Sequence, residues 1–385
     1  MEWENPDTPI LPSHYIIVGG KRFVLPYYFE FIAHVKQRWS GKTIVDMFAD
    51  EFRQRPYEYY VDAVRSGRIL VEDKKCDSEY RVRTTQKLSH FVHRHEPPVL
   101  AESIVILHEE PEVLTVCKPA SIPVHTCGQY RKNTVLGILQ AEHNTGPLFR
   151  KLALFMQFFF QLVYFLSAVH RLDRLVSGLL IFAKSAVKAD KFRQDIENGR
   201  VRKVYVAKVT GVFPEEEVVV NAAVHYDARE GRSTVEVCEE QDSKGKEACT
   251  RFVRLSTDGV SSIVECKPLT GRTHQIRVHL QHLKHPIAND DLYLHENPPK
   301  RSKRGGTADS AARSDMSRQQ QAQDSRRKVD DDREEPSFEM DPLCTHCPRL
   351  GPSGYDDDSD GLWLHCVQYS CEEWSFECPL PAWAS

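Results

Sequence analysis

Apolar residues recur at helical spacing in two stretches near the start of the chain, which predicts helices over residues 44–52 and 57–66. Gly67 follows the second stretch, where a glycine with positive φ commonly ends a helix. Residues 68–72 and 79–92 are then predicted to be strands. Two helices followed by a β-ribbon form a compact RNA-binding layout, and a small α/β domain without that function gives the same pattern.

The middle of the chain alternates predicted strands with a helix. Residues 103–118 predict two strands, and residues 185–198 predict a helix that Ser185 caps and Gly199 ends. Further strands are predicted over residues 203–211, 218–238 and 248–268. We therefore expect an α+β fold with a mixed, mostly antiparallel sheet.

Two segments depart from this pattern. Residues 152–169 are apolar on nearly every side and carry no charge, which is close to the lower length limit for a membrane span. Because Gln157 and Gln161 lie in its middle, we expect a buried helix and no membrane association, with a membrane anchor as the alternative. Residues 297–341 contain no Leu or Ile and one Val, which predicts a disordered insert. A strand predicted over residues 362–366 indicates that this insert interrupts a domain.

The charge is nearly balanced overall but uneven along the chain. Fifty-one Lys and Arg against 55 Asp and Glu in 385 residues exclude a strongly basic, histone-like protein, and 41% hydrophobic residues exclude a wholly disordered one. Residues 53–95 and 169–211 each carry 10 basic side chains, against six and four acidic ones. A local excess of this kind suits phosphate binding, and a solvated surface is the alternative.

The cysteines and the first residues indicate an intracellular protein. The chain has 11 cysteines, and its first 20 residues contain no Lys or Arg, unlike a secretory signal or a transit peptide. We expect reduced thiols in the cytoplasm or nucleus, with an organelle left open. Cys344 and Cys347 have the spacing of half a zinc site, but a second Cys-x-x-Cys is missing. We therefore expect no metal, with a structural zinc site as the alternative.

Two polar-rich segments can carry chemistry. In residues 169–184, Asp173 precedes a strand apolar enough to be central, and Arg171 and Arg174 favour its ionised form, which can act as a nucleophile or a general base. In residues 267–280, Gly271 permits a sharp turn, and cations and donors follow it. These are Arg272, His274, Arg277 and His279. If Arg277 meets Asp173, it fixes the orientation of the carboxylate; structural ion pairs are the alternative.

Three long segments resemble RluA-type RNA pseudouridine synthases, in the order that the family has them. HRLDRLVSGLLIFAKS resembles the active-site motif, RKVYVAKVTG the tyrosine motif, and PLTGRTHQIRVHLQHLKHPIANDDLY a later block. LWLHC resembles the strand that closes the catalytic domain, and residues 43–95 resemble a diverged S4-type RNA-binding domain. The resemblance implies isomerisation of a specific uridine in RNA to pseudouridine, without a cofactor.

The resemblance also implies roles for particular residues. Asp173 matches the catalytic carboxylate, which acts by attack on the ribose C1′ or by assisting formation of a glycal. Tyr205 matches the tyrosine that packs on the target base, and Arg277 the arginine paired with the Asp. Arg171 matches the arginine that enters the helix stack when the uridine flips out. Other expected RNA contacts are Arg174, Arg272, His274 and Arg68. We expect tRNA or ribosomal RNA as the partner, and a monomer.

These patterns predict five parts of the chain: an N-terminal arm (1–42), an S4-like domain (43–98), a catalytic domain (99–296), the disordered insert (297–341) and the end of the catalytic domain (342–385). Residues 150–168 form a hydrophobic insertion immediately before the HRLD motif, at a place where the family chain normally runs on directly. Its leading interpretation is a gene-model error, and a tolerated surface helix is second. If the insertion displaces Asp173, the chain is an inactive RNA-binding protein. A hydrolase using His170 and Asp173 is a weaker hypothesis.

Overall fold

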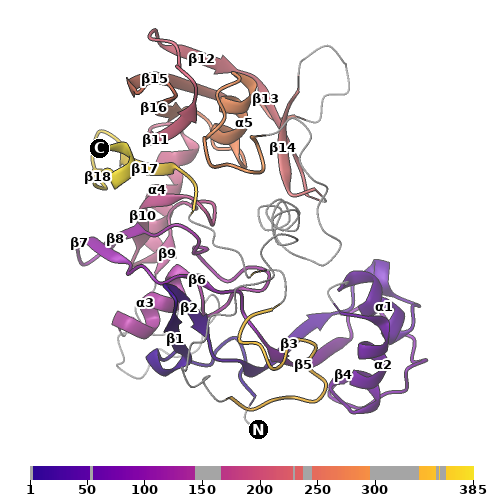
Figure 1. Cartoon of the computed structure of the whole chain (residues 1–385). Helices are drawn as coiled ribbons and strands as arrows, with labels where there is room; N and C mark the ends of the chain where they lie inside the picture. The colour runs from indigo at the N-terminus through magenta and orange to yellow at the C-terminus, as the bar shows by residue number, and fades with distance from the viewer. Residues whose placement is uncertain are drawn as a thin grey trace, which may run out of the picture.

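The computed structural model describes residues 3–52, 55–143, 166–228, 230–236, 245–294, 338–352, 355 and 361–385. Its centre is one large sheet. The strands are β7 (Val105–Glu109), β8 (Val113–Lys118), β9 (Ser167–Ala168), β10 (Ser177–Ala183), β11 (Arg202–Thr210), β12 (Val218–Asn221), β15 (Cys249–Thr257), β16 (Ser261–Pro268), β17 (Leu364–Ser370) and β18 (Ser375–Glu377). The order is β12–β15–β16–β11–β17–β10–β8–β7, with β18 on β17 and β9 on β10 (Figure 1).

Strand β17 lies in the middle of this sheet although it comes from the end of the chain. It pairs in parallel with β10 and antiparallel with β11, and the other neighbouring strands of the sheet are antiparallel. This confirms the mixed, mostly antiparallel sheet. The strand predicted over residues 362–366 is present as well, but it begins at Leu364 and continues to Ser370. Fully buried apolar side chains pack on the central strands, among them Leu179, Ala207 and Cys366. The segment after the long insert is therefore part of the central core.

Three helices accompany the sheet: α3 (Val135–His143), α4 (Ala186–Glu197) and α5 (Gln275–His282). Helix α4 has the ends that its sequence predicts. The side chain of Ser185 accepts a hydrogen bond from the backbone N–H of Lys188 at 3.1 Å, and Gly199 ends the helix with φ +67°. Helix α5 follows β16 after a tight turn, which places its first residues beside the loop that carries Asp173.

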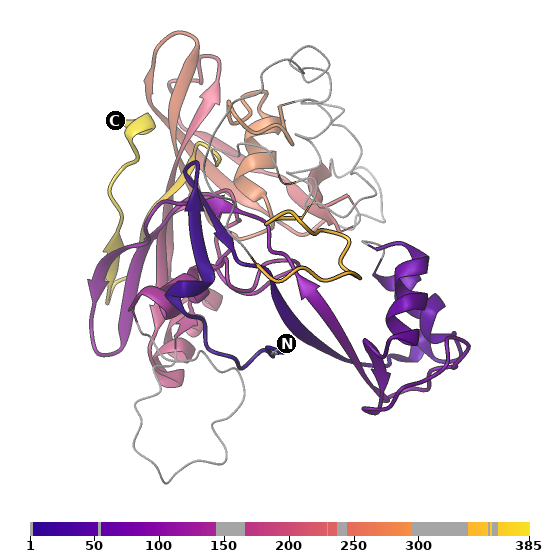
Figure 2. The ribbon, with the colours of Figure 1, turned by 60° about the horizontal axis from the view of Figure 1, so that its bottom comes forward.

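A smaller unit consists of a long two-stranded β-ribbon, two helices and one further strand. It comprises β3 (Tyr27–His34), α1 (Ile44–Glu51), α2 (Tyr57–Arg65), β4 (Ile69–Val71) and β5 (Lys87–Arg94), with strand order β3–β5–β4. Figure 2 shows α1 and α2 at the far end of this ribbon, apart from the main sheet. The two predicted helices are confirmed, and Ile44, Met47 and Tyr60 are in their shared core.

The sequence prediction was wrong in two respects in this unit. The strand predicted from residue 79 begins at Lys87, because Thr85 has φ +71°, which extended backbone does not allow. Residues 27–34 are also not a separate arm, because all eight of them pair with β5. The domain boundary that we predicted at residue 43 therefore separates β3 from its partner strand β5 in the same sheet.

The remaining strands form two small sheets. One contains β1 (Tyr15–Val18), β2 (Lys21–Val24) and β6 (Val99–Leu100), and the other contains β13 (Ala223–Asp227) and β14 (Arg232–Glu236). Short 3₁₀ helices cover Pro12–His14, Gln37–Trp39 and Ala382–Ala384.

Most of the predicted hydrophobic insertion and of the predicted disordered insert lies outside the described residues. The last residues of the hydrophobic insertion are described: Leu166 is buried, and β9 pairs with β10. Residues 338–341 of the second insert are also described, and Asp341 is buried. Among the helices in the described part of the chain, none combines the length and the apolar character that a membrane span requires.

The contact between β10 and β17 predicts a cost for any side chain at Gly178. Gly178 has φ +111°, and a Cβ there would overlap the backbone of Cys366. Gly259 has φ +87°, but a Cβ there would contact nothing within 4 Å. We expect Gly178→Ala to lower the free energy of unfolding by about 3 kcal/mol, and Gly259→Ala by about 1 kcal/mol. Urea unfolding measures both, and equal losses would contradict a backbone overlap at Gly178.

Candidate active site

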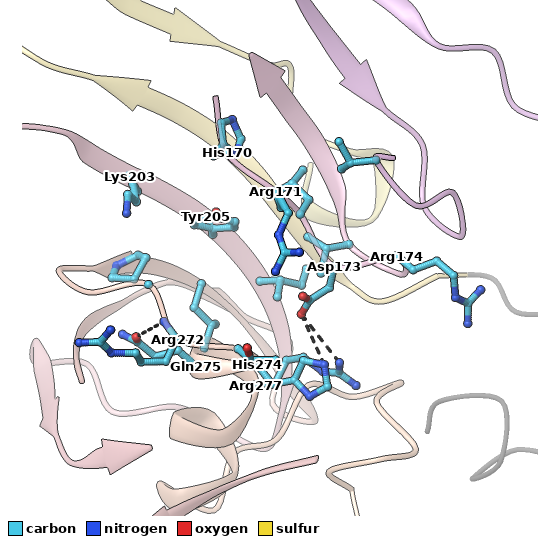
Figure 3. Close-up of a pocket in the computed structure, with 18 of the residues that line it drawn as sticks. His170, Arg171, Asp173, Arg174, Lys203, Tyr205, Arg272, His274, Gln275 and Arg277 are labelled. Atoms are coloured by element: carbon cyan, nitrogen blue, oxygen red, sulfur yellow. Dashed lines mark hydrogen bonds and ion pairs between the residues drawn. The ribbon is translucent and has the colours of Figure 1, made fainter. Parts of the chain in front are cut away.

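A cavity of about 480 Å³ lies between the loop that precedes β10 and the segment that joins β16 to α5. The side chains of Lys203 and Tyr205 on β11, and of Leu364 and Tyr369 on β17, also line it. The two polar-rich sequence segments are therefore opposite walls of one cavity, with the central strands between them (Figure 3). They come together because β10, β11, β16 and β17 are close neighbours in the sheet.

Asp173 faces a histidine and an arginine across this cavity. Its Oδ2 is 3.8 Å from Nε2 of His274 and 4.0 Å from a terminal nitrogen of Arg277, as the dashed lines in Figure 3 show. The Asp173 side chain is 38% exposed, whereas Arg277 is 1% exposed. One side of the carboxylate is thus accessible to a ligand, and the other side lies against His274 and Arg277. The sequence hypothesis that Arg277 meets Asp173 agrees with this distance.

Arg277 is fixed by a residue to which the sequence analysis gave no role. Its Nε and one terminal nitrogen donate to the two carboxylate oxygens of Asp290 at 2.6 and 2.8 Å, and both side chains are 1% exposed. The ring of Tyr293 lies 4.9 Å below the guanidinium carbon. A bidentate pair of this kind fixes the plane of the guanidinium. A buried arginine requires an acidic partner, and that requirement could have directed attention to Asp290.

The turn before α5 sets the position of His274. His274 has φ +55°, a left-handed conformation, and its Nδ1 is 2.8 Å from the hydroxyl of Tyr293. The side chain of Gln275 accepts hydrogen bonds from the backbone N–H of Arg272 and from the hydroxyl of Thr270, at 2.9 and 2.8 Å. Together these contacts hold the turn so that His274 and Arg277 approach the same carboxylate.

Tyr205 lies on the floor of the pocket, with its hydroxyl 3.0 Å from that of Tyr369. Burial raises the pKa of Tyr205 well above its usual value, so the phenol remains protonated. His170 stacks on Tyr369 with ring centroids 4.1 Å apart, and burial lowers the pKa of His170 to about 3. Such a weak base, held against an aromatic ring, does not fit the hydrolase hypothesis of a His170–Asp173 pair.

Lys118 anchors the backbone beside Asp173. Its Nζ donates to the carbonyl oxygens of Pro119, Ile122 and Arg174 at 2.8, 2.8 and 3.0 Å, and the side chain is fully buried. Arg174 is the residue after Asp173, so Lys118 ties the loop that carries Asp173 to the end of β8. Burial lowers the pKa of Lys118 to about 7. The sequence analysis gave this lysine no role.

The residues expected to contact RNA are divided between two places. Arg171, Arg174 and Arg272 line the pocket, and Arg171 and Arg272 are exposed. Arg68 does not line the pocket: it forms a 2.8 Å ion pair with buried Asp341. The pocket therefore surrounds one carboxylate with several cations, a charge pattern that suits a polyanionic ligand. Two clusters of His and Cys side chains that could hold a metal are found in the described residues, and both lie outside this pocket.

Comparison with known proteins identifies similar chains. A family model described as RNA pseudouridylate synthase matches residues 112–282. The chain is 55% identical to RNA pseudouridine synthase 7 of Oryza sativa subsp. japonica, over 99% of this chain and 95% of the relative. It is 30% identical to tRNA pseudouridine(31) synthase of Saccharomyces cerevisiae, over 95% of this chain and 96% of the relative. It is 40% identical to mitochondrial tRNA pseudouridine(32) synthase of the same yeast, over 74% of this chain and 58% of the relative.

The pair of Arg277 and Asp290 predicts asymmetric effects of substitution. Asp290→Asn leaves a buried cation without its counter-ion, and we expect the free energy of unfolding to fall by about 3–5 kcal/mol. Replacing both residues by apolar ones, with Arg277→Met and Asp290→Leu, should cost less, because no buried charge remains. Urea unfolding measures both. Asp190→Asn, at an exposed ion pair with Arg193, serves as the control and should leave the free energy of unfolding almost unchanged. A double variant less stable than Asp290→Asn would contradict this account.

Lys118 predicts a pH-dependent contribution to stability. Its folded pKa of about 7 lies below the value of about 10.4 for an unfolded lysine, so the unfolded chain binds more protons between these two values. The free energy of unfolding of the wild type, relative to Lys118→Met, should therefore rise from pH 7 to 9, by at most about 1.4 kcal/mol per pH unit. Below about pH 7 the difference should be constant. If the difference between wild type and Lys118→Met instead stayed constant up to pH 9, the hydrogen bonds to the three carbonyl oxygens would keep Lys118 protonated in the folded protein.

Proposed function

The chain belongs to the RNA pseudouridine synthase family and is an isomerase, and on this premise we propose that Asp173 is its catalytic carboxylate. The observation that carries the proposal is the position of Asp173. It is the acidic side chain in the lining of a pocket rich in cations, and His274 and Arg277 hold one of its oxygens. A ligand with a phosphate backbone can enter such a pocket and bring one sugar to the carboxylate.

The reaction needs one well-placed carboxylate and no oxidant or reductant. The bond between N1 of uracil and C1′ of ribose breaks, a bond between C5 and C1′ forms, and C5 loses the proton that the ring nitrogen gains. Asp173 acts by attack on C1′ or by assisting formation of a glycal, and both routes require its oxygen beside that carbon. Arg277, held rigidly by Asp290, lies 4.0 Å from the carboxylate of Asp173 and orients it.

Two further side chains receive roles in presenting the uridine. Tyr205 lies on the pocket floor as a protonated phenol, which suits stacking on a uracil ring. Arg171 is exposed at the pocket, where it can occupy the space that a flipped nucleotide leaves in the helix. Flipping is required because C1′ and C5 of a stacked uridine are not accessible to a carboxylate in a pocket. Arg174, Arg272 and His274 would contact the adjoining backbone.

The substrate is proposed to be tRNA. The support is the similarity to the two yeast proteins named as tRNA pseudouridine(31) and tRNA pseudouridine(32) synthases. The small unit with α1 and α2 is proposed to act as an S4-like RNA-binding domain. Its exposed basic side chains, Arg65, Arg81 and Arg83 among them, would bind the phosphate backbone outside the pocket. Arg68 is not proposed as a contact, because Asp341 already neutralises it.

The inactive RNA-binding protein is not supported as an alternative. That hypothesis required the hydrophobic insertion to move Asp173 away from its partners. In the described residues, Asp173, Tyr205 and Arg277 line one pocket, and the end of the insertion continues into a strand paired with β10. The features expected of an active site are therefore present together.

Pseudouridine mapping of total RNA tests the proposal. After incubation with the wild-type protein, we expect new pseudouridine at a defined tRNA position, and none above background with Asp173→Ala. Loss of the carboxylate should reduce the rate by at least about 10³-fold. Asp190→Asn, an exposed acid on α4, is the matched control and should retain full activity. An active Asp173→Ala variant would falsify the assignment, and modification confined to ribosomal RNA would overturn the choice of tRNA.

A further inference from the structure

Four potential metal ligands from the two ends of the chain meet next to the ribbon of β3 and β5. They are His93, at the end of β5, His95, Cys344 and Cys347, and their ligand atoms all lie within 4.8 Å of one another. Nδ1 of His93 is 3.2 Å from Nε2 of His95, and Sγ of Cys347 is 3.3 Å from the first nitrogen and 3.6 Å from the second. In both views the segment after the long insert lies beside β5 (Figures 1 and 2).

These separations match the edges of a tetrahedron around a zinc ion. Zn–N distances of about 2.0–2.1 Å and a Zn–S distance of about 2.3 Å give tetrahedral edges of roughly 3.3 Å between nitrogens and 3.5–3.6 Å between nitrogen and sulfur. The observed distances are 3.2 Å between the two nitrogens and 3.3 and 3.6 Å between a nitrogen and the sulfur of Cys347, which are close to these values. Sγ of Cys344, the fourth potential ligand, lies within 4.8 Å of the other three ligand atoms.

The groups around the cluster orient two of these ligands. Nδ1 of His95 is 3.1 Å from the carbonyl oxygen of Leu350, an acceptor that fixes the proton on Nδ1 and leaves a lone pair on Nε2. The backbone N–H of His346 donates to Sγ of Cys344 at 3.4 Å, a contact that helps to fix the position of the sulfur. His93 and His95 are 2% and 4% exposed, and Cys344 and Cys347 are half-buried.

We propose that His93, His95, Cys344 and Cys347 bind one structural Zn²⁺ ion. Zinc fits because it accepts mixed nitrogen and sulfur ligands in tetrahedral geometry and has no redox chemistry. On binding, each of the two thiols releases one proton to solvent, and the two thiolates neutralise the 2+ charge of the ion. The electroneutral complex can remain buried. The earlier expectation of no metal is thereby revised.

The proposed ion would tie residues 338–352 to the small unit. Around the cluster, Phe338 stacks on His93 with ring centroids 6.2 Å apart, and Asp341 pairs with Arg68 at 2.8 Å. The same stretch of chain leads into β17 at the centre of the main sheet. The zinc site would therefore hold residues 338–352 against strand β5 of the proposed RNA-binding unit.

Metal analysis of the full-length protein tests the proposal. Protein purified from zinc-supplemented minimal medium without chelators should contain about one equivalent of zinc by mass spectrometry. The Cys344→Ser/Cys347→Ser double variant should lose it. Cys371→Ser, at a cysteine outside both potential metal clusters, is the matched control and should keep it. Zinc retained in the double variant would overturn the proposal, because the metal would then lie elsewhere, for example at Cys117, His365 and Cys378.

A second measurement does not depend on the folding of a variant. Wild-type protein exchanged with Co²⁺ should show the strong visible bands of tetrahedral cobalt and a thiolate-to-metal charge-transfer band, and one equivalent of Zn²⁺ should abolish both. A protein that binds Co²⁺ without a thiolate band would contradict the ligand set. A metal-free protein in which Cys344 and Cys347 form a disulfide would also overturn the proposal, and thiol counting under denaturing conditions detects that bond.

Discussion

Arg277 and Asp290 are each about 1% exposed and form two parallel hydrogen bonds, so neither charge can be solvated by water. Removing either partner leaves an unpaired charge in the core, and this constraint fixes the start of α5 relative to the turn at residues 287–290. The outer side of the same guanidinium faces Asp173. The position of the Asp173 carboxylate thus depends on a buried ion pair, and the turn held by Gln275 brings His274 to the same oxygen.

The features that the sequence predicted correctly depend on neighbouring residues. Helix α4 has its cap at Ser185 and its ending glycine because both signals lie within one or two turns of the helix. Asp173 was placed before a central strand because the apolar run that follows it is continuous. The pairing of β3 with β5 was missed, because its partners are about 60 residues apart and no local signal links them. Asp290 was missed for a similar reason: Arg277 already had an expected partner in Asp173.

The proposed zinc site also combines residues that lie far apart in the sequence. Half of it was visible as Cys344-x-x-Cys347, and a second Cys-x-x-Cys was sought and not found. The other half is His93-x-His95, two residues apart at the end of a strand, a spacing that places both side chains on one face. About 250 residues separate the two halves. Only the fold brings them together, and it does so at the point where the small unit meets the segment leading to β17.

The central position of β17 has a consequence for synthesis on the ribosome. Strands β10 and β11 both hydrogen-bond to β17, yet 181 residues separate Ala183 from Leu364. At translation rates of about 5–20 residues per second, the nascent chain holds β10 without its central neighbour for roughly 10–40 s. During that time two apolar strands present open edges, which are templates for aggregation or for binding by chaperones. The order of the strands therefore delays completion of this sheet until β17 has been synthesised, and a chain truncated before residue 364 would retain both open edges.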